Sequence, residues 1–358
     1  MLFRSGAYMA APGTVRAAVA GVTSSAGILG LVRFLPGGEA DYVTWGTLCL
    51  VLGLGSAFYG ALVGSVQRDT RVVLAYSSMS QFGLMTAGLG AGLLSGELWP
   101  AAIAAVAAYM VHHALAKAAL FAGDDLLRTA GRGPVVALLL AIPALALAGL
   151  PLTSGAVAKV ALKTATGELG GPWGDRLETM LSVAAVGTTL LMARFLFMAL
   201  SGSAGRSVSA SVRRTVAAVA LVAAGLAIPW LVGSEPIAYA AKKSLSAYYL
   251  WALSWPVLLG ITLAVAAWLL RGTRMSRVIG SIAPADIWHP VLRGANAIWD
   301  RYQEHIVGTG KSARTESEPV NDRLTPARAI EAVILSWPVA SGTVAVLVLI
   351  FLVLAAVA

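Results

Sequence analysis

The sequence predicts an all-α membrane protein, a polytopic bundle of about nine membrane-spanning helices with one broken helix and a cytoplasmic amphipathic segment. Of its 358 residues, 58% are hydrophobic and only 12% are charged. The mean hydropathy is +0.78. The apolar residues also gather in runs that reach the ~20 residues a helix needs to cross a bilayer. These observations exclude a soluble domain.

The apolar runs follow one another along the whole chain, with short connections between most of them. No signal peptide is expected before the first run, because the N-terminal residues lack a small-residue cleavage site after a separate apolar core. The expected spans cover about 15–34, 43–65, 72–95, 99–123, 135–166, 179–201, 214–233, 248–270 and 333–357.

The fifth run, 135–166, is longer than one crossing and is expected to form a broken helix. Gly149-Leu150-Pro151 and Ser154-Gly155 interrupt it. Pro151 lacks a backbone N–H and blocks a continuing helix, while the glycines tolerate a turn. Unwound backbone at membrane depth is tolerated only where protein buries it or where it lines a wet cavity. The interruption therefore predicts two half-helices at a site of this kind.

Residues 271–329 are the least apolar part of the chain. Ile287, Val291, Ile298 and Trp299 fall near helical spacing with charged residues between them, which is typical of an amphipathic helix on a membrane surface or a partner subunit. The polar residues after it indicate a flexible tether. The chain thus divides into a bundle at 1–270, this segment at 271–329 and a final helix at 330–358.

The basic residues predict how the bundle is oriented, since short cytoplasmic loops carry an excess of Lys and Arg. We expect the N-terminus to lie in the cytoplasm and the C-terminus outside the plasma membrane. Inside lie Arg4, Arg16, Arg68, Arg71, Arg128, Arg132, Arg206, Arg213 and Arg214; outside lie Arg33, Arg176, Lys242 and Lys243. The net charge of +9 is explained by these loops, so no nucleic-acid partner is expected.

Four basic residues lie inside the expected spans: Lys117, Lys159, Lys163 and Arg194. All other Lys and Arg residues fall in the N-terminal segment, in the loops, at the ends of spans or in 271–329. A charge at bilayer depth costs at least ~2.5 kcal/mol, and such residues usually mark an ion or proton path. On the fourth span Tyr109, His113 and Lys117 are spaced i, i+4, i+8 and share one face, with His112 about 100° away.

No Asp or Glu lies centrally in a span, so these bases are expected to have no carboxylate partner within the membrane part of this chain. Desolvation favours an uncharged amine, which suits a proton carrier, unless a carboxylate of another chain holds it charged. The alternative for each residue is structural. The lysines could snorkel to an interface, the histidines could satisfy helix packing, and Arg194 could hold a carbonyl of the broken helix.

The sequence predicts no cofactor and no metal site. The single Cys49 lies in an apolar span, so neither a disulfide framework nor a thiol metal site can form. The four histidines are scattered, and only the adjacent His112 and His113 leave a small possibility of metal binding.

Three motifs, in this order, carry a resemblance to a known family: QRDTRVVLAYSSMSQFG, HALAKAALF and LALAGLPLTSGAVAK. They are similar to motifs of the antiporter-like membrane subunits of respiratory complex I and the Mrp cation/proton antiporters. The resemblance covers about 8–200. It implies that Lys117 is the central proton-relay lysine, His113 its neighbouring histidine and Lys159 the lysine of the broken helix.

The chain departs from the family pattern in three respects. Ala156 stands where the family has Phe, and Leu152 where it has a second proline. The span 15–34 offers only Thr23, Ser24 and Ser25 where the family often has His or Lys. Family members also have several more helices before this region. The chain therefore resembles the C-terminal half of a split subunit, with another chain supplying the first half and the missing carboxylate.

The resemblance implies a proton-conducting subunit of a multi-subunit complex, either with or without exchange of Na⁺ for H⁺. It would be a transporter subunit, or a translocase subunit of an NADH dehydrogenase-like complex, without a redox site of its own. Its expected partners are other membrane subunits, protons, sodium and the bilayer. The alternative is a non-conducting scaffold, or a membrane anchor for a soluble carbon dioxide-hydrating or redox enzyme. The expected relay comprises Lys117, His113, Lys159, Lys163, His112, Tyr109 and Arg194.

Overall fold

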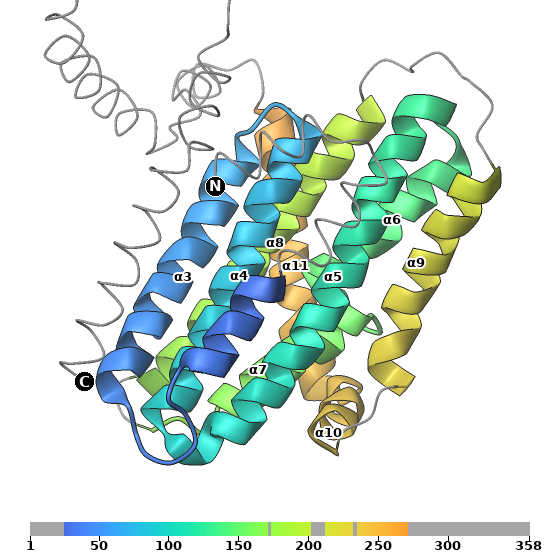
Figure 1. The fold of residues 1–358 in the computed structure, drawn as a ribbon. Coiled ribbons are helices and arrows are strands. Elements are labelled where there is room, and N and C mark those ends of the chain that lie inside the picture. Colours follow the sequence, from blue (N-terminus) through green and yellow to red (C-terminus); the bar gives the residue numbers. More distant parts are fainter. Residues whose placement is uncertain (1–24, 171–172, 202–211, 232–234, 271–358) are drawn as a thin grey trace, which may run out of the picture. The chain divides into compact units, whose positions relative to one another are not determined.

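The structure is a computed structural model that describes residues 25–170, 173–201, 212–231 and 235–270. All of them belong to the first of two compact units, Met1–Ala285. The described residues form helices and contain no strand, which confirms the all-α prediction for this part of the chain (Figure 1). The last expected span, the segment 271–329 and the first half of the span 15–34 lie outside the described residues.

The first described helices follow the expected spans closely. A short apolar helix covers Ser25–Phe34. Helices α3 (Val43–Ser65) and α4 (Thr70–Leu94) come next and pack closely against each other. Asp69 starts α4 because its side chain accepts a hydrogen bond from the N–H of Arg71, which satisfies one of the free donors of the first turn.

Helix α5 (Trp99–Ala130) is the element around which the site is built. It runs seven residues past its expected end at 123, because Asp124 and Arg128 pair along its last turns instead of ending it. A proline stands at its start, and Gly131, with a φ of 79°, ends it. It contacts α4, α6, α7 and α9, the helices that surround it (Figure 1).

The chain is interrupted where the sequence predicted a break. Helix α6 (Pro134–Ala148) ends at Gly149, which has the left-handed conformation (φ 89°), and α7 (Ser154–Thr166) begins five residues later. Thr153 caps α7 by accepting a hydrogen bond from the N–H of Ala156. That α6 and α7 lie in the membrane as two half-spans stays a prediction.

The remaining helices are α8 (Gly174–Ser201), α9 (Val212–Leu231), α10 (Glu235–Ser244) and α11 (Ala247–Leu269). Helix α10 was not expected from the sequence. It packs mainly against α7, which explains why ten residues without a long apolar run still form a helix.

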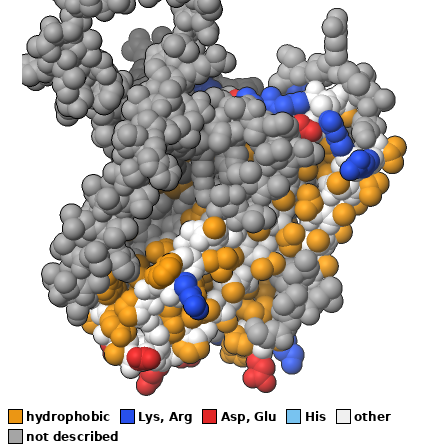
Figure 2. All heavy atoms as spheres, in the orientation of Figure 1, with side chains coloured by type: hydrophobic (Ala, Val, Ile, Leu, Met, Phe, Trp, Pro, Cys, Tyr) orange, Lys and Arg blue, Asp and Glu red, His pale blue; other side chains and the backbone are white. Residues whose placement is uncertain are grey.

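Four described helices are long and apolar enough to cross a membrane: α3, α5 with its preceding turn, most of α8, and α11. Figure 2 shows hydrophobic side chains over the middle of the visible face, with Lys and Arg side chains gathered at its upper end. This distribution is that of an integral membrane protein.

Candidate functional site

Lys117 is fully buried in the middle of the bundle. Its Nζ donates a hydrogen bond to the backbone carbonyl of Leu74 in α4, at 2.7 Å, and its exposed fraction is 0%. Ser78, one turn further along α4, donates to the same carbonyl at 3.2 Å. A carbonyl oxygen accepts a hydrogen bond from an amine and from an ammonium alike. This position can therefore hold Lys117 in either protonation state.

Tyr109, two turns before Lys117, is held by a chain of hydrogen bonds across three helices. Its hydroxyl donates to Gln81 Oε1 of α4 at 2.7 Å, and Gln81 Nε2 donates to Thr188 Oγ1 of α8 at 2.9 Å. Thr188 in turn donates to the carbonyl of Ala184. This chain of hydrogen bonds fixes the position of Tyr109 against α4 and α8.

The two histidines of α5 have different surroundings. His112 Nδ1 lies 2.8 Å from Ser154 Oγ, at the start of α7. The His112 ring meets Tyr109 edge to face at 6.2 Å between centroids. His113 is also buried, and its ring contacts Phe82 of α4 edge to face at 4.8 Å. His112 therefore joins α5 to the break, whereas His113 faces α4.

Lys159 reaches back from α7 to the end of α6. Its Nζ donates to the carbonyl of Ala148 at 2.6 Å, an acceptor that the interruption leaves without a helical partner. Gly149 makes this contact possible. A Cβ at Gly149 would lie 2.7 Å from Lys159 Cδ and 2.9 Å from its Nζ, so a larger residue would occupy the space of the lysine.

Gly155 lets the start of α7 approach α6 and α5. A Cβ there would collide with the carbonyl oxygen of Ala146 and would lie 3.0 Å from His112 Nε2. Ser154 and Gly155 together therefore place the break against His112.

A small cavity connects the lysines of α7 with Tyr109. Tyr109, Gly149, Lys159, Lys163 and Ser182 line it, together with apolar residues of α4, α8 and α11. Its volume is about 20 Å³. Since ~10–15 Å³ holds one water, the cavity has room for about one.

Lys163 lies beside a carboxylate just outside the expected spans, and the expectation that no carboxylate partner lies within the membrane part of the chain stays a prediction. Lys163 Nζ donates to Ser182 Oγ at 2.7 Å and lies 3.9 Å from Glu178 Oε1. Glu178 stands in the first turns of α8, one residue before the expected span, and the packing of α7 on α8 brings it to Lys163.

Arg194 lies apart from the other predicted relay residues. Its Nε and Nη2 donate to the carbonyl of Gln67, between α3 and α4, at 3.3 and 3.0 Å. It therefore holds the connection between α3 and α4, not a carbonyl of the broken helix. Of the seven predicted residues, the structure brings Tyr109, Lys159 and Lys163 to one cavity and places His112 beside it.

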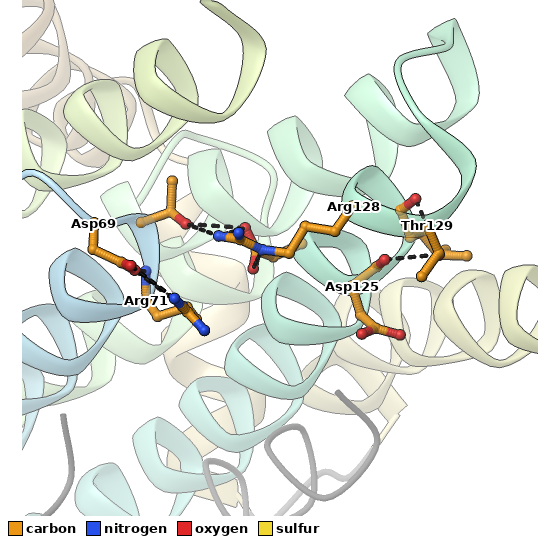
Figure 3. Close-up of polar contacts among 8 residues, drawn as sticks. Asp69, Arg71, Asp125, Arg128 and Thr129 are labelled. Atoms are coloured by element: carbon orange, nitrogen blue, oxygen red, sulfur yellow. Dashed lines mark hydrogen bonds and ion pairs between the residues drawn. The ribbon is translucent and has the colours of Figure 1, made fainter. Parts of the chain in front are cut away.

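A polar cluster joins the start of α4 to the end of α5 (Figure 3). The buried carboxylate of Asp124 accepts hydrogen bonds from Thr70 at 3.1 Å and from Arg128 at 2.9 Å.

Beside this group, Asp69 pairs with Arg71 at 2.9 Å. Partial burial raises the pKa of the Asp69 carboxyl, but the hydrogen bonds and charge of Arg71 outweigh this and hold that pKa below its usual range. The cluster fixes α4 against α5. Because Leu74 lies in α4, the cluster also helps to hold the Leu74 carbonyl in contact with Lys117.

The fold and these buried groups define an all-helical membrane protein with ionisable side chains in its interior. Residues 5–174 match the family described as "NADH:quinone oxidoreductase/Mrp antiporter, TM". Over 174 residues the chain is 37% identical to an "Uncharacterized protein" of Mycobacterium tuberculosis, covering 43% of this chain and 27% of that protein.

Two further proteins are similar to this chain. NADH-quinone oxidoreductase subunit N 2 of Solidesulfovibrio magneticus is 29% identical over 213 residues, which are 56% of this chain and 43% of that protein. A chain in the structure of the Mrp complex from Dietzia sp. DQ12-45-1b has the same fold, with a TM-score of 0.65 and 24% identity, covering 97% of this chain and 39% of that one. The chain thus spans less than half the length of each of these proteins.

These findings confirm the resemblance. Residues 5–174 match the model of the NADH:quinone oxidoreductase/Mrp antiporter family, and the chain is similar to antiporter-like membrane subunits.

Proposed function

We propose that this subunit conducts protons through the buried side chains of α5 and α7. Lys117, His113, His112, Tyr109, Lys159 and Lys163 form the relay. Arg194 is left out of it, because its guanidinium is committed to the Gln67 carbonyl. The observation that carries the proposal is the cavity shared by Tyr109, Lys159 and Lys163, beside a helix interruption in which Lys159 donates to the Ala148 carbonyl.

The chemistry of the acceptors supports a relay better than a purely structural role. Lys117 and Lys159 each donate to one backbone carbonyl, and neither contact requires the charged form. A structural lysine that reached the headgroups would instead place its amine at the surface. Lys117, with no exposed surface, does not.

Protons are expected to move between Lys117 and Lys159 through His113, His112 and intervening water. Along α5, Tyr109 and Lys117 are about 12 Å apart by the ~1.5 Å rise per residue. A neutral imidazole can accept a proton at one nitrogen and release one from the other, so the histidines can bridge part of this distance.

We propose further that other membrane subunits complete the complex. The chain is similar to 39% of a chain in an Mrp complex and to 43% of an NADH-quinone oxidoreductase subunit. Exchange of Na⁺ for H⁺ belongs to the same proposal and is tested by imposing a Na⁺ gradient in the experiment below.

The test is proton flux in sealed vesicles that contain the assembled complex. Lys159→Met and Lys117→Met keep the length of the side chain and remove its proton site, so each is expected to lower flux about 100-fold. Lys242→Met, on the exposed face of α10, is the matched control and should leave flux unchanged.

Assembly is measured in the same membranes by co-purification. Normal assembly with unchanged flux in both variants would exclude the relay. The chain would then be a scaffold, or an anchor for a soluble enzyme.

A further inference from the structure

The first turns of α8 carry a carboxylate that joins the buried cavity to the surface. Glu178 is 41% exposed, whereas its neighbour Lys163 is only 8% exposed, and the two charged groups lie 3.9 Å apart. A separation of this length is closed by a small movement of either side chain or by one bridging water. Glu178 and Lys163 thus link the surface of this chain to its interior.

Ser182 gives Lys163 a second contact, further inside. It lies one turn beyond Glu178 on the same face of α8 and accepts a hydrogen bond from Lys163 Nζ at 2.7 Å. Its own hydroxyl donates to the backbone carbonyl of Glu178 at 2.9 Å. Ser182 is therefore fixed in place, and the amine of Lys163 lies between it and the carboxylate.

The inner side of this group is the cavity described above. Ser182, Lys163 and Lys159 all line it, and it has room for about one water molecule. Lys163 is thus the side chain that contacts both the exposed carboxylate and the space in which Lys159 lies. The remaining wall toward α11 consists of Ala252, Leu253 and Pro256, which offer no competing proton site.

We propose that Glu178, Lys163 and Ser182 form the port through which protons pass between solvent and the relay. The carboxylic acid of Glu178 gives its proton to the neutral amine of Lys163, which leaves a carboxylate and an ammonium. The ammonium then gives a proton through water in the cavity to the amine of Lys159 and returns to the neutral form. Protons can move through the same steps in reverse. This proposal rests on the proposed function, because a port requires a relay behind it.

The first test is the proton flux of Glu178→Gln in vesicles with the assembled complex. This change keeps the shape of the side chain and removes its proton, so flux should fall about tenfold while slower direct exchange with water continues. Glu178→Asp retains a proton site and should recover most of the flux, a rescue that a purely structural role does not predict. Glu168→Gln is the matched control. It removes an exposed carboxylate just past the end of α7 that lies outside the cavity with the lysines.

A second test measures, without using flux, how accessible Glu178 and Lys163 are from the protein surface. In a Cys49→Ala background, a small membrane-impermeant thiol reagent should label Glu178→Cys fastest and Lys163→Cys more slowly. It should leave Val160→Cys unlabelled, because Val160 is completely buried.

The outcomes separate the port from the relay. If wild type conducts and Lys159→Met does not, but Glu178→Gln conducts like wild type, the port is wrong and the relay stands. Equal loss in Glu178→Gln and Glu168→Gln, or labelling of Glu178→Cys no faster than that of Val160→Cys, would also overturn the port. An assembled wild type that conducts no protons would overturn the relay and the port together.

Discussion

Two residues with left-handed backbone shape the interruption that positions Lys159. Gly149 has a φ of 89° and Leu152 a φ of 66°. Glycine adopts this conformation readily, whereas a leucine does so at a cost of about 1–2 kcal/mol. Leu152 stands where the resembling family has a second proline, and proline is locked near −65°. The backbone at residue 152 therefore has a conformation that a proline could not adopt.

Substitution of Leu152 tests this backbone path. Leu152→Pro should lower the stability of the protein by at least about 1 kcal/mol, because the ring cannot reach a positive φ. Leu152→Gly should be as stable as wild type or more stable. The side chain is 68% exposed, so its loss removes little packing. Thermal unfolding in detergent measures both. A Leu152→Pro protein as stable as wild type would contradict the left-handed conformation.

At the scale of elements, α3 and α4 form the most closely packed pair of helices in the described part of the chain. Glycines seven residues apart on each helix face the backbone of the other: Gly46, Gly53 and Gly60 on α3, and Gly83 and Gly90 on α4. Without side chains at these positions the helix axes approach closely. The position of α4 matters for the site, since α4 supplies the Leu74 carbonyl to Lys117 and Gln81 to Tyr109.

A pair of glycines on α3 gives a matched test of this packing. A Cβ at Gly53 would lie 2.6 Å from the backbone N of Ala87 and from the carbonyl oxygen of Gly83, whereas a Cβ at Gly55 meets nothing within 4 Å. Gly53→Leu should therefore separate the helices, destabilise the protein by about 1–3 kcal/mol and reduce proton flux. Gly55→Leu should do neither. Similar unfolding temperatures for the two variants would mean that α3 and α4 do not approach in this way.

At the scale of the whole molecule, the sequence predicted the class of fold and most helix positions, because long apolar runs determine both. The gap between α6 and α7 falls at the glycines and proline where the sequence predicted a break, because these residues act on the backbone locally. That α6 and α7 form one broken membrane helix stays a prediction. Helix α10 was missed, since its packing on α7 is not visible in its own residues. The Lys163–Glu178 contact was missed for a related reason: Glu178 lies at the edge of an apolar run, and only the packing of α7 on α8 brings it near. The acceptors of Lys117, Lys159 and Arg194 are backbone carbonyls, which have no signature in a sequence.

The orientation of the bundle decides to which side of the membrane the proposed port opens. Exposed arginines gather at one end of α5 and α9, at Arg128, Arg132, Arg213 and Arg214, while the port lies near the opposite end of α5, where α7 ends and α8 begins. The excess of basic residues on cytoplasmic segments predicts that the arginine end faces the cytoplasm and the port faces outside.

Two glycines with open space around them allow the orientation to be measured without altering any charge. Gly133 lies beside Arg132 and Gly170 lies between α7 and α8, and a Cβ at either meets nothing within 4 Å. In the Cys49→Ala background, a membrane-impermeant thiol reagent added outside sealed right-side-out vesicles should label Gly170→Cys and leave Gly133→Cys unlabelled. Inverted vesicles should give the reverse. The opposite result would place the port on the cytoplasmic side, so that Glu178 would exchange protons with the cytoplasm and the direction of the relay would be reversed.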